Sequence, residues 1–235
     1  MYALSEKGER IRAMFGSIAP RYDLLNRLLS LGIDRRWRRF AVGKIGLCGP
    51  GRVLDVATGT GDVALEIAAQ TPASVNIVGV DFCPEMVELG QVKVQESAHA
   101  GRITLQVAPC EEIPFEEGSF DAATISFGIR NVVDRIKGLS EMRRVLKDGG
   151  RIVILEFSTP TSPLFRSLYH FYFLKMLPVI GGAFSRFSAY RYLPDSVLEF
   201  PSRQEFQAMM TRVGFKEVRH YDLTGGIATV YVGTK

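Results

Sequence analysis

Short apolar runs alternate with segments of helical hydrophobic spacing between residues 52 and 157. Uninterrupted apolar runs bounded by turn residues are typical of buried strands, and apolar residues that recur every three or four positions are typical of helices. The pattern predicts strands near residues 52–57, 76–81, 103–108, 120–126 and 151–157. It predicts helices near residues 62–70, 84–97 and 133–147, the last ended by Asp148-Gly149-Gly150. This alternation predicts a parallel sheet with helices on both faces.

The segments on either side of this core have different patterns. Residues 6–47 show helical spacing and are expected to form N-terminal helices. Residues 158–200 are rich in Phe, Tyr, Pro and Ser and are interpreted as an inserted aromatic cap. Residues 201–213 are expected to be helical, and residues 215–221 and 227–233 to form two strands. Because these strands would pair antiparallel, the chain is expected to form a Rossmann-like α/β sheet of seven strands.

The chain of 235 residues is expected to be a single domain. Its hydrophobic content of 46% is enough for a substantial core. The predicted parts are an N-terminal helical cap at 1–47, a cofactor-binding core at 48–157, the cap insertion at 158–200, and a C-terminal helix and strand pair at 201–235.

A glycine turn follows the first predicted strand. Residues 53–62 read VLDVATGTGD, so the strand contains Asp55 and the turn contains Thr58, Gly59, Thr60 and Gly61. A second apolar run ends at Asp81, twenty residues after Gly61. A strand, a glycine turn, a helix and a second strand that ends in an acid are typical of the nucleotide half-site of doubly wound α/β folds.

Charge at this turn indicates which nucleotide binds there. A dinucleotide would place its pyrophosphate at the helix N-terminus, where Asp55 and Asp62 would repel it. S-adenosylmethionine carries a sulfonium and an ammonium group and no phosphate, so it suits an acidic turn. Asp81 is then expected to accept hydrogen bonds from the ribose hydroxyls. The alternative is that Asp62 only caps the helix and Asp55 only ends the strand.

The composition of the chain limits the cellular locations and the classes of binding partner that are expected. The net charge of +4 is modest and lacks the large basic excess of a nucleic-acid-binding protein. Three cysteines, Cys48, Cys83 and Cys110, form no disulfide framework and indicate a reducing compartment. The sequence shows no secretory signal and no apolar run long enough to span a bilayer. A cytoplasmic location without a metal ion is expected.

Several longer motifs resemble the ubiquinone/menaquinone C-methyltransferases, a family of the seven-stranded S-adenosylmethionine-dependent methyltransferases. The motifs are MFGSIAPRYDLLN at residues 14–26, SLGI at 30–33 with Trp37-Arg38, SFGIRNV at 126–132, LEFS at 155–158 and SAYRYLPDS at 188–196. They extend almost from end to end of the chain. The segments around Arg130-Asn131 and Tyr190-Arg191-Tyr192-Leu193 are more specific than the glycine turn.

The resemblance implies methyl transfer from S-adenosylmethionine to a ring carbon of a polyprenylated quinol. Demethylmenaquinol is the expected acceptor, and a ubiquinone-branch or dual-specificity enzyme is the alternative. The family's cofactor positions correspond here to Thr60, Asp81, the turn at Pro109-Cys110 and Ser126. Family members usually have Asp or Asn at the position of Pro109, so adenine recognition is expected to use backbone groups near Cys110 and Glu111.

Methylation of a quinol carbon is favoured when a ring hydroxyl loses its proton. Because phenols titrate near pH ~10, a base or a cation must lie beside that oxygen. Arg130, after the fourth predicted strand, is the candidate cation, and a structural ion pair is its alternative role. Further candidate catalytic residues are Tyr22, Asp23 and His170. Asn131 either orients a hydroxyl or caps the following helix.

The aromatic cap is interpreted either as a small packed core or as a cleft for the prenyl tail. The apolar stretch at residues 164–180 and the cluster Arg35, Arg36, Arg38 and Arg39 suit peripheral contact with the inner face of the plasma membrane, although a solvated helix face also explains the arginines. A homo-oligomer is compatible with the sequence.

Three rival interpretations belong to other classes of protein. A nucleic-acid methyltransferase is disfavoured because no catalytic motif of that class follows the fourth strand. A dinucleotide-dependent oxidoreductase is disfavoured by Asp62. A non-catalytic scaffold that keeps the fold is disfavoured by the intact acids of the cofactor turn.

Overall fold

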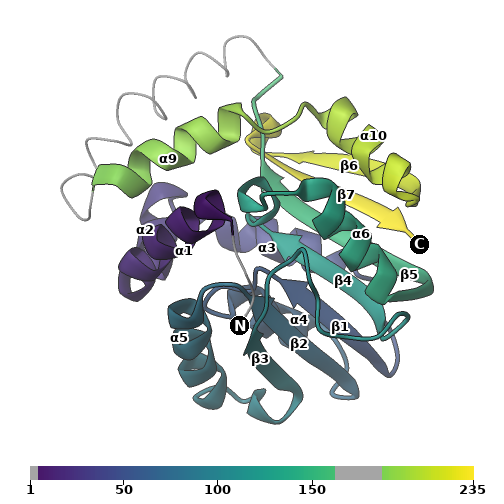
Figure 1. Ribbon diagram of the computed structural model, residues 1–235. Helices are drawn as coiled ribbons and strands as arrows, with labels where there is room; N and C mark the ends of the chain where they lie inside the picture. Colours follow the sequence, from purple (N-terminus) through teal and green to yellow (C-terminus); the bar gives the residue numbers. More distant parts are fainter. Residues whose placement is uncertain (1–4, 162–186) are drawn as a thin grey trace.

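The computed structural model describes residues 5–161 and 187–235, and a seven-stranded sheet forms its centre (Figure 1). The strand order is β3-β2-β1-β4-β5-β7-β6. The strands are β1 Gly51–Val56, β2 Val75–Asp81, β3 Ile103–Val107, β4 Phe120–Ser126, β5 Leu146–Phe157, β6 Lys216–Leu223 and β7 Ala228–Thr234. β1 to β5 pair in parallel, and β7 lies antiparallel between β5 and β6. The predicted fold class is confirmed.

Helices cover both faces of this sheet. α3 (Asp34–Gly43), α4 (Asp62–Gln70) and α5 (Pro84–Gln95) pack on one face, and α6 (Arg135–Val145) and α10 (Arg203–Val213) pack on the other. In β1, Val53 belongs to the first of these cores and Leu54 to the second. Central strands of a sheet covered on both faces are apolar on both sides, which is why they appear in the sequence as uninterrupted apolar runs.

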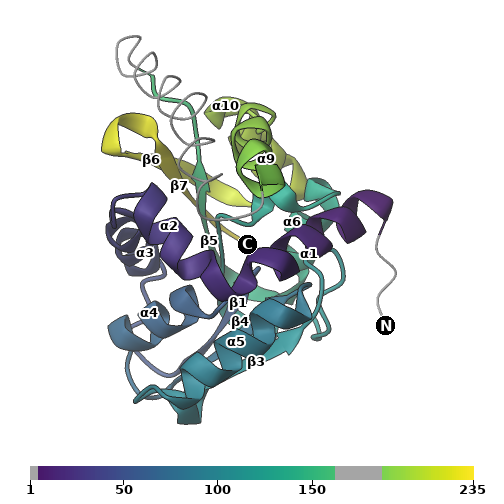
Figure 2. The ribbon, with the colours of Figure 1, turned by 90° about the vertical axis from the view of Figure 1, so that its left-hand side faces the viewer.

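Three further helices gather at the end of the sheet where β1, β2 and β4 have their carboxyl termini. α1 (Glu6–Ile18), the short turn η1 (Ala19–Arg21) and α2 (Tyr22–Leu29) lie there with α9 (Phe187–Leu198). Figures 1 and 2 show α1 and α9 beside one another in both views. The segment between the two described ranges contains residues 164–180, so the predicted membrane-contacting stretch lies outside the described residues.

One predicted boundary is wrong. The helix expected at residues 133–147 is α6, which begins after its N-cap Asp134 and ends at Val145. Leu146 already pairs with Phe120 as the first residue of β5 and is fully buried, so it belongs to the sheet. Asp148-Gly149-Gly150 therefore lies inside β5, at an irregular register between Phe120 and Ala122, and does not end the helix.

The described part of the chain has neither a membrane-spanning helix nor a metal-binding cluster of side chains. No helix in residues 5–161 and 187–235 is both long and apolar enough to cross a membrane. Over the same ranges, no three His, Cys, Asp or Glu side chains are grouped in a way that could hold a metal ion.

Candidate active site

The glycine turn after β1 lies against the end of β2. Gly59 and Gly61 have φ angles of 55° and 82°, which non-glycine residues rarely adopt. The Thr58 amide donates to the Val80 carbonyl at 3.0 Å. A Cβ atom at Gly79 of β2 would lie 2.7 Å from Thr58 Oγ1 and 2.4 Å from Leu105 Cδ2. The close approach of turn and strand therefore requires glycine at position 79.

Asp81 connects this turn to the start of α5. Its Oδ2 accepts a hydrogen bond from the Gly59 amide at 2.9 Å, and its Oδ1 accepts one from the Cys83 amide at 2.9 Å. Burial raises the pKa of Asp81 to about 6, although these amides oppose the shift. The carboxylate retains lone pairs for further donors, so it can also accept hydrogen bonds from a ribose, as the sequence predicts.

Asp55 lies at the N-terminus of α4. It accepts a hydrogen bond from Thr58 Oγ1 at 2.6 Å, and the nearby Ala64 amide in the first turn of that helix lowers the pKa of its carboxyl group. Burial raises the pKa of Asp55 to about 7. In dinucleotide-binding proteins the free amides of this helix end bind the pyrophosphate. Here the Asp55 carboxyl group lies beside the Ala64 amide, so a pyrophosphate at this helix end would meet an acidic side chain.

Asp62 does not present an uncompensated charge to a ligand. Its carboxylate pairs with Arg38 Nη1 at 2.5 Å and with Lys93 Nζ at 2.7 Å. Burial alone would raise the pKa of Asp62, but these two cations hold it below its usual range. The expectation that Asp62 itself repels phosphates is therefore wrong, because neighbouring cations neutralise it.

Lys93 also reaches the N-terminal helices. Its ammonium group pairs with Asp23 of α2, and Thr60 Oγ1 donates to the same carboxylate at 2.6 Å. Asp23, predicted as a catalytic residue, is thus used in a network that connects α2, the glycine turn and α5. The sequence analysis missed Lys93 because 70 residues separate it from Asp23.

We expect Lys93→Met to weaken S-adenosylmethionine binding about tenfold, because the loss of charge-assisted hydrogen bonds frees Asp23 and the turn beneath it. Isothermal titration calorimetry with the purified protein measures the change. Lys147→Met, which removes a lysine pairing with Asp121 on the surface, is the matched control and should bind normally. Equal affinity of the two variants would contradict the role given to Lys93.

Tyr22 lies against the glycine turn. Its Cε1 atom is 3.9 Å from the position of a Cβ atom at Gly59, and its ring packs edge-on against Phe15. Burial raises the pKa of Tyr22, while a hydrogen bond with Asn26 and the positive charge of Arg130 oppose the rise. The structure therefore brings Tyr22 and Asp23 to the turn, as the sequence predicts, and Asp23 is engaged there in an ion pair with Lys93.

Arg130 follows β4 in the short turn η3 (Ile129–Asn131) and forms a buried ion pair. Its Nη1 donates to Glu156 Oε1 at 2.7 Å, and the Glu156 side chain is 0% exposed. Phe127 O also accepts from Nη1, which fixes the guanidinium group at the end of the sheet. Arg130 Nε is buried and has no hydrogen-bond partner among the described residues. The ion-pair alternative is thus observed, and the buried Nε–H has no partner among the described residues.

Two further polar atoms lie buried at the same end of the sheet. Ser126 Oγ at the end of β4 and Asp55 Oδ1 in β1 have no hydrogen-bond partner within the described part of the chain. Buried polar atoms are rarely left unpaired unless a ligand or water satisfies them. Together with Asp81 and the close-packed turn, they fit S-adenosylmethionine, which offers hydroxyl and ammonium donors.

The predicted adenine turn is mostly packed into the core. The Cys110 sulfur would lie 2.8 Å from a Cβ atom at Gly138 of α6, and burial raises the pKa of its thiol. Glu111 Oε1 accepts from the Val133 amide at 3.0 Å. Pro109 is buried as well. Contact of the Pro109-Cys110 backbone with adenine stays a prediction.

The sequence analysis assigned no role to Tyr192 of α9. Its hydroxyl donates to Asn131 Oδ1 at 3.0 Å, next to Arg130. Asn131 does not cap α6, because Asp134 does. A signal was available, since Tyr192 belongs to the specific motif at residues 188–196. His170, the remaining catalytic candidate, lies outside the described residues.

The raised pKa values predict how pH affects the site. Between about pH 4 and pH 7 the folded protein holds more protons on Asp55 and Asp81 than the unfolded chain, so their contribution to stability falls as pH rises through about 6–7. A cationic ligand favours the ionised carboxylates. Its affinity should therefore rise from about pH 5.5 to 7.5, with proton release on binding near pH 6.

Calorimetry at pH ~6 in two buffers of different ionisation enthalpy measures this proton release. Identical binding enthalpies in both buffers, together with an affinity that does not vary with pH, would contradict the assignment of the two carboxylates to the cofactor site.

A sheet of this strand order with a glycine turn and buried acids at its carboxyl end is typical of S-adenosylmethionine-dependent methyltransferases. Solved structures support the fold. The [4+2]-cyclase SpnF superposes with a TM-score of 0.72 at 14% identity, over 97% of this chain and 96% of its own. Phosphoethanolamine N-methyltransferase 2 of Haemonchus contortus in complex with S-adenosyl-L-methionine superposes with a TM-score of 0.62 at 16% identity, over 84% of this chain and 52% of its own.

The chain belongs to the ubiE/COQ5 methyltransferase family, whose model matches residues 3–235. A protein of Geobacter sp. (strain M21), named ubiquinone/menaquinone biosynthesis C-methyltransferase UbiE, is 86% identical over 100% of both chains. The demethylmenaquinone methyltransferase of Deinococcus radiodurans is 48% identical over 98% of this chain and 94% of its own. The resemblance found in the sequence is confirmed.

Proposed function

We propose that the protein transfers the methyl group of S-adenosylmethionine to a ring carbon of a polyprenylated demethylquinol, and that demethylmenaquinol becomes menaquinol. The end-to-end match to relatives with these names carries the proposal. The fold alone would not carry it, because a cyclase shares the fold.

Different residues at the carboxyl end of the sheet would bind the methyl donor and stabilise the quinol. Asp81, Asp55, Ser126 and the Gly59 turn would hold the donor, which supplies an electrophilic methyl group when bound. Arg130 is fixed by its ion pair with Glu156, which compensates its charge, and would offer its unpaired Nε–H as a donor to the quinol oxygen. A fixed donor at this oxygen stabilises the phenolate, which makes the ring carbon nucleophilic. Tyr22 encloses the reacting groups from α2.

A direct comparison of two substrates tests which type of ring the methyl acceptor has. Purified protein is given labelled S-adenosylmethionine with a demethyl naphthoquinol or a demethyl benzoquinol, each with the same prenyl tail. We expect faster transfer to the naphthoquinol. Faster transfer to the benzoquinol would favour the ubiquinone branch, which the name of the Geobacter relative includes. Transfer to neither would contradict the proposal.

Peripheral contact with the cytoplasmic face of a membrane is part of the proposal, because a prenylated quinol resides in the bilayer. Arg35, Arg36 and Arg39 of α3 are exposed and could meet anionic lipid. Arg38 does not belong to this surface, because it is buried between Asp34 and Asp62. Co-sedimentation with phosphatidylglycerol vesicles should occur and should be lost in a variant with Arg35, Arg36 and Arg39 replaced by Gln.

A further inference from the structure

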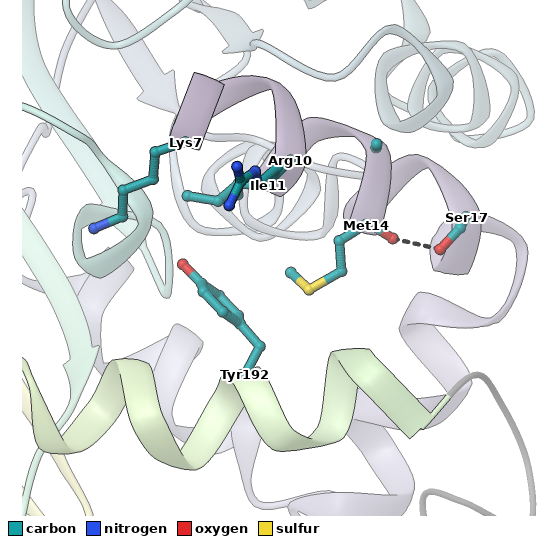
Figure 3. Close-up of a pocket in the computed structure, with 7 residues that line it drawn as sticks. Lys7, Arg10, Ile11, Met14, Ser17 and Tyr192 are labelled. Carbon is teal, nitrogen blue, oxygen red and sulfur yellow. Dashed lines mark hydrogen bonds between the residues drawn. The ribbon is translucent and has the colours of Figure 1, made fainter. Parts of the chain in front are cut away.

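A groove lies between α1 and α9, above the reacting end of the sheet. Its volume is about 500 Å³, within the usual range of ~300–1,000 Å³ for small-molecule sites. Figure 3 shows Met14 of α1 and Tyr192 of α9 pointing toward each other across it, with Ile11 beside them. The groove is therefore walled by two helices that are far apart in the sequence.

The helical spacing of α1 explains why this side of the helix is free to line a groove. Residues 7, 10, 11, 14 and 17 recur every three or four positions and all border the groove. The other side of α1 faces α5, where a Cβ atom at Gly16 would meet the Glu85 side chain at 3.0 Å. One helix thus packs on the core and presents its second face to α9.

The chemistry of the lining suits an uncharged hydrocarbon. Ile11, Ala13 and Met14 supply apolar surface, and the Tyr192 ring closes the opposite wall. Lys7 and Arg10 border the groove with long alkyl stems, and their charged ends can stay in water. Among the described residues, Arg10 pairs with Glu6 in a surface contact of 3.8 Å, and none of their ion pairs closes the groove at this point.

Tyr192 connects the groove with the reacting groups. The same side chain that walls the groove donates its hydroxyl hydrogen bond to Asn131, at 3.0 Å. Asn131 directly follows Arg130, whose guanidinium group is fixed by Glu156 at the carboxyl end of the sheet. A ring that approaches Arg130 would therefore have a substituent directed past Tyr192 into the groove.

We propose that the groove between α1 and α9 binds the isoprenoid side chain of the quinol. The proposal rests on the function proposed above and places the tail against α1. A branched hydrocarbon gains free energy when it leaves water for an apolar surface, and the lining offers such a surface. Held there, the tail would keep the ring oriented beside Arg130, so tail binding would contribute to the position of the reacting carbon.

The test fills the groove without changing the groups at the reacting end. Ala13→Trp places a large side chain in the groove from an exposed helical position. Lys137→Trp places the same side chain at an exposed position of α6, which does not line the groove, and is the control. KM is measured for a demethyl naphthoquinol with an isoprenoid tail and for the same ring without one. Thermal melting establishes that both variants are folded.

For Ala13→Trp we expect KM of the tailed quinol to rise at least about tenfold and KM of the tail-less quinol to stay within about twofold; Lys137→Trp should change neither. An unchanged KM of the tailed quinol, or an equal rise for both quinols, would overturn the proposal.

A binding measurement distinguishes failure of the groove from failure of the proposed reaction. Calorimetry with the tailed and tail-less quinones, without a methyl donor, should show tighter binding of the tailed compound, and Ala13→Trp should remove the difference. If this difference is observed while no methyl group is transferred, the assignment of the groove to the isoprenoid tail is supported and the proposed reaction is contradicted. If the unmodified protein binds both quinones equally, the groove assignment fails.

Discussion

Replacement of Arg130 by Met should abolish methyl transfer and also destabilise the fold. Removal of one partner of a buried ion pair leaves the other charged and unpaired, at a cost of about 3–5 kcal/mol. Glu156 is fully buried and is the carboxylate that would be left unpaired. Denaturant unfolding measures the loss of stability, and a single-turnover assay measures transfer.

A double variant separates the two roles of Arg130. In Arg130→Met/Glu156→Gln no unpaired charge remains, and the Gln side-chain oxygen can still accept from the backbone amide of residue 130 or that of Phe157. We expect most of the stability to return, the affinity for S-adenosylmethionine to stay within about threefold, and kcat to remain at least about 100-fold reduced. Recovery of normal kcat in the double variant would show that Arg130 acts only as a structural partner of Glu156.

Asp81→Ala should weaken S-adenosylmethionine binding about 100-fold. The change removes an acceptor for the ribose hydroxyls and also frees the Gly59 and Cys83 amides. A charge-assisted hydrogen bond contributes about 1.5–3 kcal/mol, which corresponds to roughly ten- to hundredfold in affinity. Equilibrium dialysis with labelled donor measures the change.

Asp121→Ala is the matched control for Asp81→Ala. Asp121 also lies in the sheet and accepts a hydrogen bond from a backbone amide, that of Arg52, but it is at the opposite end of the strands. The Asp121→Ala variant should bind S-adenosylmethionine normally even if its free energy of unfolding falls. Because Asp81→Ala could disturb the turn itself, Asp81→Asn serves as a second variant that keeps the shape of the side chain. Normal donor affinity in Asp81→Asn would contradict the role of the carboxylate.

Much of the fold was predictable because its signals are local. Val53 and Leu54 face different cores of one strand, so the strand reads as an apolar run. The glycine turn and Asp81 follow their strands directly, which places them at one end of a parallel sheet. The end of α6 was missed because Leu146 is recruited into β5 by pairing with Phe120, a contact that no local pattern contains.

The contacts between distant segments were less predictable. Lys93 joins Asp23 to Asp62, and Arg38 is buried beside Asp62 although its neighbours Arg35, Arg36 and Arg39 are exposed. A lysine or arginine in a helical segment gives no sign in the sequence that it forms a buried ion pair, because charged side chains on helices usually face water. The hydrogen bond between Tyr192 and Asn131 likewise depends on the position of α9. These residues became visible as site components only in three dimensions.

The central claim is that the buried carboxylates at the end of the sheet bind a cationic methyl donor and exclude a dinucleotide. Parallel calorimetric titrations of the purified protein with S-adenosylmethionine and with NADH at pH ~7.5 test it most directly. The account predicts saturable binding of S-adenosylmethionine at one site per chain and no detectable heat with NADH. Saturable binding of NADH together with no heat from S-adenosylmethionine would contradict it.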